Sequence, residues 1–296
     1  MKTAIISAGD SGYFPLLKGL ILSIHQHRPD VEIALRVLDV GLERGQVEEL
    51  RALGVGVVPG RWDYEFPGRD TFDRWFQAMT GRCHLPKYFP EFELLIWIDA
   101  DAWLQDWRAI GLLCEGAARG GLAVVPELHR SYTHVYYMAE FNHNKLYDVY
   151  RMAFVEQHAR FLAASPVINS GVFALRGDSP IWQVWAKWMA IALRPNGALA
   201  NKMSEQSALN AAFYFDRVTI VPLPAWCNWM CGQALPALDG KTRKLVEPVI
   251  PNEPISIVHV SMDRAKVREI QTLDGRKLSV RLDYLAWQEE LAGMGD

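Results

Sequence analysis

An uninterrupted apolar run that ends at two carboxylates constrains this chain more than any other feature of its sequence. The run extends from Leu94 to Ile98 and leads directly into Asp99-Ala100-Asp101. Because it is short, apolar at every position and contains β-branched and aromatic residues, it predicts a strand buried in the middle of a parallel sheet. Ligands of open α/β sheets bind beyond the carboxyl ends of such strands, which is where Asp99 and Asp101 lie.

The two carboxylates predict a site for a hard divalent cation. In extended backbone Asp99 and Asp101 point the same way, and a turn after Asp99 would still let both reach one ion. Carboxylate oxygens suit Mg²⁺ or Mn²⁺, with phosphate completing the coordination shell. The alternative is a strand that simply ends at a polar turn. We favour the cation site because other parts of the chain supply further components of the same site.

The first sixty residues predict a doubly wound α/β arrangement. Strand and helix patterns alternate there, and this order is typical of a parallel sheet covered by helices. The predicted strands and helices are Thr3–Ala8, Pro15–His27, Ile33–Leu38, Gln46–Leu53 and Val55–Val58.

The loop after the first predicted strand, Gly9 to Tyr13, is expected to bind a ligand. It lacks the glycine patterns of dinucleotide-binding proteins and of P-loop NTPases. Its small residues would let backbone N–H groups approach a nucleotide. Tyr13 could stack on a base, or it could be a core aromatic residue at the start of a helix.

Three later segments place polar residues at the ends or interruptions of apolar elements. The predicted strand from Val167 to Leu175 is interrupted by Asn169-Ser170-Gly171, and a glycine inside a strand marks a bulge or a close approach by a ligand. A predicted helix from Ser204 carries Glu205 and Gln206 in its first turn, where Gln206 could also merely cap the helix. A late predicted strand, 255–260, contains His259, a potential third metal ligand or an ordinary core residue.

The remaining predicted elements complete an α/β chain. An aromatic stripe on the helix after Asp178-Ser179-Pro180 (Trp182, Trp185, Trp188 or Met189, and Leu193) is assigned to the core. The others are a helix at Thr71–Arg82, strands at Gly121–Val125 and Val218–Leu223, and a final helix at Tyr284–Leu291.

Composition narrows the class of protein. Half of the 296 residues are hydrophobic, and the net charge of −3 argues against a general nucleic-acid binder. Four scattered cysteines predict reduced thiols. No apolar stretch is long enough to span a membrane, and Asp10 interrupts any apolar segment of a signal peptide. These features predict a cytoplasmic protein with at most peripheral membrane contact, through basic residues between Lys266 and Arg281.

Taken in order, six segments resemble the GT-A-fold glycosyltransferases of the family 8 type. These are retaining galactosyl- and glucosyltransferases that include glycogenin and bacterial lipopolysaccharide transferases. The similarity runs from Ile5 to about Lys266. Its motifs are Asp10-Ser11-Gly12-Tyr13, Arg82, Asp99-Ala100-Asp101, Asn169-Ser170-Gly171-Val172, Glu205-Gln206-Ser207-Ala208-Leu209-Asn210 and Ile257-Val258-His259.

The resemblance implies a fold and a reaction. The fold would be a mixed, mainly parallel Rossmann-like sheet flanked by helices, in a single domain of residues 1–296 with 263–296 as a C-terminal extension. The reaction would be transfer of a hexose from a UDP-sugar to a glycan, lipid-linked or protein acceptor, with retention of configuration and dependence on Mn²⁺ or Mg²⁺.

The resemblance also implies roles for individual residues. Gln206 would support the positive anomeric carbon, Glu127 would orient the sugar, and Glu205 stands where the family has Asp. The metal ligands would be Asp99, Asp101 and His259. Contacts to the nucleotide sugar would come from Ala8, Asp10, Tyr13, Arg82, Asp99, Ala100, Asp101, Asn169 and Lys266.

The segment after His259 departs from the family pattern. Met262 stands near the expected glycine, Lys266 is displaced by about one residue, and the Pro-Trp pair is missing. Two alternatives therefore stay open. One is a non-catalytic sugar-nucleotide or glycan-binding protein with this fold, and the other is a phosphohydrolase that uses Asp99 of the D-x-D motif as its nucleophile.

Overall fold

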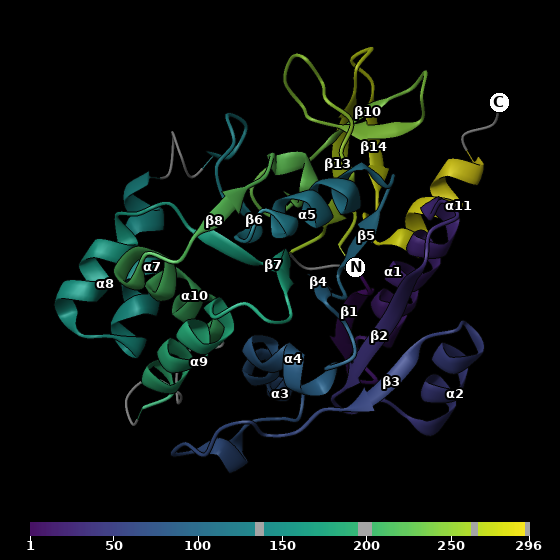
Figure 1. The fold of residues 1–296 in the computed structure, drawn as a ribbon. Helices are drawn as coiled ribbons and strands as arrows, with labels where there is room; N and C mark the ends of the chain where they lie inside the picture. Colours follow the sequence, from purple (N-terminus) through teal and green to yellow (C-terminus); the bar gives the residue numbers. More distant parts are fainter. Residues whose placement is uncertain (134–138, 195–202, 262–265, 294–296) are drawn as a thin grey trace.

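The computed structural model describes residues 1–133, 139–194, 203–261 and 266–293, which are built around a seven-stranded mixed sheet (Figure 1). The strand order is β3-β2-β1-β4-β7-β6-β8. The strands are β1 (Thr3–Gly9), β2 (Ile33–Asp39), β3 (Gly56–Pro59), β4 (Leu94–Ile98), β6 (Leu122–Pro126), β7 (Ile168–Arg176) and β8 (Ile220–Pro222).

The predicted central strand is at the centre of this sheet. β4 is parallel to β1 on one side and antiparallel to β7 on the other, so the sheet is mixed, as predicted. Pairing of Ile98 with Val172 places Asp99 beside Gly171, and the Asp99 N–H donates to the Gly171 carbonyl over 2.8 Å. The antiparallel strand β7 therefore delivers Asn169-Ser170-Gly171 to the end of β4.

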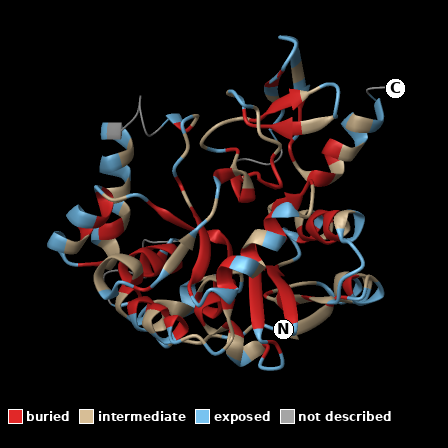
Figure 2. Cartoon of the chain, turned by 45° about the horizontal axis from the view of Figure 1, so that its top comes forward, coloured by how far each residue is buried: buried red, intermediate tan, exposed pale blue. Residues whose placement is uncertain are grey.

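Every residue of β4 is apolar because both faces of the sheet are covered. Leu95 and Trp97 belong to one hydrophobic core, and Leu94, Ile96 and Ile98 belong to the core on the opposite face. Figure 2 shows the buried strands at the centre of the molecule, enclosed by helices that are exposed on their outer sides.

Helices cover both faces and extend over one end of the sheet. The aromatic stripe of α9 is buried, as predicted, with Trp185 at 0% exposure. The α-helices are α1 (Phe14–His27), α2 (Arg44–Ala52), α3 (Phe76–Gly81), α4 (Leu85–Tyr88), α5 (Arg108–Ala118), α7 (Ala139–Ala153), α8 (Glu156–Ala163), α9 (Ile181–Ala192), α10 (Ser204–Asp216) and α11 (Tyr284–Gly293).

The prediction of one helix from Thr71 to Arg82 was wrong in its extent. Thr71 ends a 3₁₀ turn, η1 (Arg69–Thr71), helix α3 starts only at Phe76, and Arg82 opens a second 3₁₀ turn, η2 (Arg82–His84). Phe72 is extended and stacks on Phe76 with ring centroids 4.4 Å apart. Aromatic packing between the residue after η1 and the first residue of α3 thus overrides the local helical pattern.

Two smaller sheets complete the described structure. One contains β5 (Ala102–Leu104), β12 (Ile257–His259) and β9 (Trp229–Met230). The other has the order β11-β10-β13-β14, and α11 beside it packs against α1 (Figure 1). The strands of this second sheet are β10 (Ala237–Asp239), β11 (Lys244–Val246), β13 (Arg268–Thr272) and β14 (Lys277–Val280).

The C-terminal segment shares its sheet with earlier residues. β13 pairs in parallel with β10, and residues 266–293 contribute to a third hydrophobic core with Trp103 and Trp229. All four cysteines are free thiols. In the described ranges, no helix combines the length and the apolar character that crossing a membrane requires. Met262 lies outside these ranges.

Trp185 joins α9 to the first turn of α10 and should contribute strongly to stability. Its indole N–H donates to the Glu205 carbonyl over 2.9 Å. We expect Trp185→Ala to lower the free energy of unfolding by about 3–5 kcal/mol, measured by urea denaturation, because it leaves a large cavity. Phe161, which is 50% exposed on α8, serves as the control, and Phe161→Ala should cost clearly less. Equal losses in the two variants would contradict this assignment.

Candidate functional site

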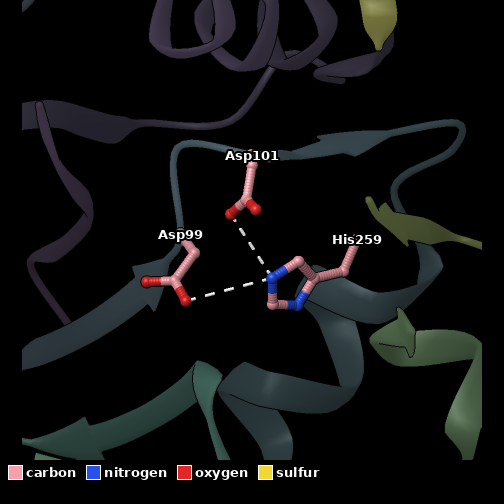
Figure 3. A group of neighbouring side chains, drawn as sticks. All are labelled: Asp99, Asp101 and His259. Atoms are coloured by element: carbon pink, nitrogen blue, oxygen red, sulfur yellow. Dashed lines mark ion pairs between the residues drawn. The ribbon is translucent and has the colours of Figure 1, made fainter. Parts of the chain in front are cut away.

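Asp99, Asp101 and His259 meet at the carboxyl end of β4 (Figure 3). The chain turns after Asp99, with the Ala102 N–H donating to the Asp99 carbonyl over 2.9 Å. β5 then runs antiparallel to β12, and this register sets His259 opposite Ala102. The short strand β5 therefore carries the D-x-D turn to a histidine more than 150 residues away in the sequence.

The three side chains point toward a common centre and could hold a divalent cation. His259 Nε2 lies 3.4 Å from Asp101 Oδ1 and 4.0 Å from Asp99 Oδ2. One ligand atom from each residue lies within 4.8 Å of the others. Two carboxylates and one imidazole form a donor set that suits Mn²⁺ and Mg²⁺ when phosphate oxygens complete the shell. These residues fit the metal that the sequence predicts.

The electrostatics of the group favour a positive charge at its centre. Burial alone lowers the pKa of His259, but the Asp101 and Asp99 carboxylates outweigh burial and raise the pKa above its ordinary value. Burial raises the pKa of Asp99, although Arg82 and His259 offset part of this effect. A proton on the imidazole or a cation among the three groups relieves the same excess of negative charge.

Arg82 is buried beneath this group and joins it to α10. The guanidinium is 2% exposed; its Nη2 lies 2.7 Å from Asp99 Oδ1, and its Nη1 lies 2.5 Å from Glu205 Oε1. Nη1 also donates to the Ser170 carbonyl over 3.1 Å, and the guanidinium lies over the Trp97 ring. Because both terminal nitrogens are engaged, Arg82 mainly balances the charge of two carboxylates and holds their positions.

Gln206, Asn169 and Glu127 form a second polar group beside the first. Gln206 Oε1 accepts hydrogen bonds from the Ser170 backbone N–H over 3.2 Å and from Asn169 Nδ2 over 3.4 Å. Asn169 Nδ2 also donates to Glu127 Oε1 over 2.9 Å. The side chain of Gln206 thus reaches β7 and does not cap its own helix, for which no side-chain capping hydrogen bond is found.

A pocket of about 520 Å³ opens over the first loop and the D-x-D turn. Tyr13 is 40% exposed at its edge, which rules out the interpretation of Tyr13 as a core residue. Asp10 Oδ1 accepts from the Tyr13 N–H over 2.8 Å and so shapes the loop. Predicted contact residues that line the pocket are Ala8, Asp10, Tyr13, Arg82, Asp99, Ala100, Asp101 and His259.

Five other predicted residues do not line this pocket. Glu127, Asn169, Glu205 and Gln206 are buried beside it in the polar groups described above. Lys266 is exposed just before β13, and its contact to diphosphate stays a prediction.

Comparison with solved structures identifies the architecture. The chain is similar to the galactosyltransferase LgtC in complex with donor and acceptor sugar analogues, with 16% identity, a TM-score of 0.56, and coverage of 99% of this chain and 96% of that one. It is also similar to the glycosyltransferase GlyE of Streptococcus pneumoniae, with 14% identity, a TM-score of 0.54, and coverage of 98% of this chain and 60% of that one. A third similar structure is mouse xyloside xylosyltransferase 1, with 13% identity, a TM-score of 0.51, and coverage of 87% of this chain and 97% of that one. The chain has the GT-A glycosyltransferase fold. No protein-family model and no curated protein sequence matches it.

The predicted fold is therefore confirmed. The structure also adds two residues to the site to which the sequence assigned no role, Ser170 and Asn228. Ser170 donates to Glu205 and also contacts Gln206 through its hydroxyl. Asn228, fully buried before β9, lies between His259 and Asn169. Neither residue type marks a site by itself. The Asn169-Ser170-Gly171 interruption of a strand was the available signal for Ser170, whereas a single asparagine after Cys227 carried none.

Gly171 leaves the space in which the two polar groups meet. A Cβ at this position would lie 2.6 Å from His259 Cε1 and 2.7 Å from Asp99 Oδ2, so one of the two side chains would have to move. Of the two predictions for this glycine, the irregularity in the strand is confirmed, because the pairing of β6 with β7 shifts from Val124–Phe173 to Val125–Asn169; a close approach by a ligand stays a prediction. The strand interruption is thus a steric requirement of the site.

Replacing Gly171 should disturb the GT-A core, in contrast to a matched helical glycine. We expect Gly171→Ala to lower the free energy of unfolding by about 1–3 kcal/mol, as overpacking does. Gly111 lies on α5 with nothing within 4 Å of its Cβ position, and Gly111→Ala should be neutral or stabilising by up to about 1 kcal/mol. Chemical denaturation measures both values, and an unaltered Gly171→Ala protein would refute the steric argument.

Proposed function

We propose that this protein is a metal-dependent glycosyltransferase that moves a hexose from a UDP-sugar to an acceptor with retention of configuration. The observation that carries the proposal is the Asp99-Asp101-His259 group at the mouth of a pocket in a GT-A fold. The acceptor would be a glycan, a lipid-linked sugar or a protein.

The pocket supports binding of a nucleotide diphosphate sugar. Its volume of about 520 Å³ lies within the usual range for small-molecule sites. Tyr13, which is exposed at the edge of the pocket, would stack on a base, and the small residues Ala8 and Gly9 would let the donor approach the end of β1 closely. The choice of uridine comes from the resemblance at Asp10 and Tyr13.

The charge that builds on the leaving diphosphate is the main chemical problem in this reaction. A divalent cation held by Asp99, Asp101 and His259 would supply Lewis-acid stabilisation of that charge. Asp99 is held in place by Arg82 and by the Trp97 indole N–H, which donates to Asp99 Oδ1 over 2.8 Å. Two donors on one carboxylate oxygen leave the other, Oδ2, directed toward His259.

Departure of the diphosphate would leave a positive charge on the anomeric carbon of the sugar, and a negatively polarised atom nearby would stabilise it. Gln206 Oε1 is held by the Ser170 N–H and by Asn169 Nδ2, and the partial negative charge of this oxygen would support the anomeric carbon. A carboxamide is a weak nucleophile, so we assign electrostatic support and attack on the face from which the diphosphate departs. Glu127 and Asn169 would hold sugar or acceptor hydroxyls, and Glu205 would position Gln206 through Ser170.

The two alternative functions, a phosphohydrolase and a binding protein without turnover, predict different assay results. The GT-A fold argues against the phosphohydrolase, and Asp99, its required nucleophile, is engaged with Arg82. A binding protein without turnover would bind nucleotide sugar but not hydrolyse it. Metal-dependent release of UDP from a UDP-sugar without acceptor therefore separates the enzyme from the binding protein, and release of phosphate from a phosphomonoester would indicate the phosphohydrolase.

The metal group can be tested by thermal shift with UDP-hexoses and Mn²⁺. Ligand binding at about 100 times Kd stabilises a fold by about 2.7 kcal/mol. We expect the parent protein to show a Mn²⁺-dependent rise in Tm with UDP-sugars, and Asp101→Asn to abolish it. Asp178 is paired with Arg176 on the surface, and Asp178→Asn should behave as the parent.

Asp101 is a cleaner test position than Asp99. Asp99→Asn should also abolish Mn²⁺-dependent binding, but it weakens the buried contact with Arg82 as well and therefore lowers the Tm of the free protein. Unchanged metal-dependent binding in both variants would rule out the site. Tighter binding of GDP or ADP than of UDP would rule out the donor class.

Gln206 allows a test of mechanism that is separate from donor binding. If its oxygen acts mainly on the transition state, Gln206→Ala should lower kcat by roughly a hundred- to a thousandfold, by analogy with the loss of an oxyanion-hole donor, with little change in donor affinity. Single-turnover kinetics and calorimetry measure the two quantities. A variant that loses stability but retains full turnover would leave Gln206 with a structural role only.

A further inference from the structure

Asn228 is a fully buried amide. It lies between His259 of the Asp99-Asp101-His259 group and Asn169 of the second polar group, which also contains Gln206 and Glu127. It directly follows the 3₁₀ turn η3 (Ala225–Cys227) and precedes β9, which is parallel to β12 and pairs Met230 with His259. Its Oδ1 lies 2.9 Å from His259 Nδ1, and its Nδ2 lies 2.8 Å from Asn169 Oδ1. A buried side chain with both ends engaged in this way has a fixed orientation.

The direction of each hydrogen bond follows from a backbone group with an unambiguous role. The Gly171 backbone N–H can only donate, and it donates to Asn169 Oδ1 over 2.8 Å. With the oxygen of Asn169 assigned in this way, its Nδ2 donates to Glu127 Oε1. Asn169 therefore presents its oxygen to Asn228. Asn228 must then turn its NH₂ toward Asn169 and its oxygen toward His259.

This orientation determines the tautomer of His259. The Asn228 oxygen can only accept, so the proton of the neutral imidazole lies on Nδ1. The lone pair then lies on Nε2, which is the nitrogen that faces Asp101 and Asp99 (Figure 3). In metal centres, the hydrogen bond made by one ring nitrogen sets how the other is presented to the ion.

We propose that Asn228 is a positioning residue that holds His259 as the Nδ1–H tautomer with Nε2 directed at a divalent cation. This inference rests on the proposed function, because it concerns the same metal group. It adds that His259 is connected through Asn228 and Asn169 to Glu127. Glu127, which would contact the sugar, therefore also helps to maintain the orientation of the metal ligand His259.

The tautomer itself can be observed without metal or substrate. Nitrogen-15 NMR of labelled imidazoles distinguishes a protonated from an unprotonated ring nitrogen, and a His259→Asn variant identifies the His259 signals among the eight histidines. In the neutral ring of the parent protein we expect Nδ1 to be protonated. In Asn228→Leu, which has a similar size but no acceptor, we expect the Nε2–H tautomer to appear. A neutral parent ring that carries its proton on Nε2 and not on Nδ1 would overturn the proposal.

The consequence for the metal can be measured by calorimetric titration with Mn²⁺ alone. Loss of a hydrogen-bond partner behind a ligand typically weakens metal binding by about ten- to a hundredfold, and we expect this loss in Asn228→Leu. Asn228→Asp keeps an acceptor for the Nδ1–H and should bind Mn²⁺ far more tightly than Asn228→Leu. Rescue by the acceptor would not follow from a merely structural role.

Asn210 provides the control for loss of a buried amide. It is fully buried, and its side chain bonds only backbone groups of Ile168 and Gln206 among the contacts described. Asn210→Leu should lower Tm as Asn228→Leu does but retain Mn²⁺ affinity. If the two leucine variants bind Mn²⁺ equally well, the proposal is overturned.

The experiments separate this inference from the proposed function. If Asn228→Leu does not fold, the parent tautomer and the Mn²⁺ affinity of Asn228→Asp decide the question. If the parent protein binds no UDP-sugar in the presence of Mn²⁺, the proposed function fails. The Nδ1–H tautomer in the parent and its loss in Asn228→Leu would then still support the orienting role of Asn228.

Discussion

A single buried guanidinium joins the parts of this site. Arg82 lies between the Asp99 carboxylate at the end of β4 and the Glu205 carboxylate in the first turn of α10, with its plane over Trp97. Removing one partner of such a buried pair typically costs about 3–5 kcal/mol, because the other charge stays buried without compensation. The pair therefore ties α10, and with it Gln206, to the strand that carries the D-x-D turn.

The antiparallel strand in the middle of the sheet gives the site its second half. β7 enters between β4 and β6, so Asn169, Ser170 and Gly171 lie beside the carboxyl end of β4. A sheet with only parallel strands would present only loops at that edge. Here the backbone of a strand supplies the Ser170 N–H to Gln206 and the Gly171 carbonyl to the Asp99 N–H.

Much of the framework could be predicted from sequence because it depends on local pattern. The run from Leu94 to Ile98 is buried on both faces, the stripe on α9 is core, and Glu205 and Gln206 begin a helix, as predicted. The helix expected from Thr71 was mistaken because contacts between Phe72 and Phe76 are stronger than a local preference. The Arg82 to Glu205 pair spans 123 residues and carries no local pattern.

The sequence by itself determined which residue types end the central strand, and hence that a hard cation suits the site. The spacing of apolar residues along the sequence also determined which face of each helix and strand is buried in a core. Tertiary structure alone decided that β5 would pair with β12 and bring His259 to Asp101, and that Asn228 would lie behind His259. The reason is physical: hydrophobic burial follows short repeating patterns along the chain, whereas hydrogen-bond direction depends on partners that only folding brings together.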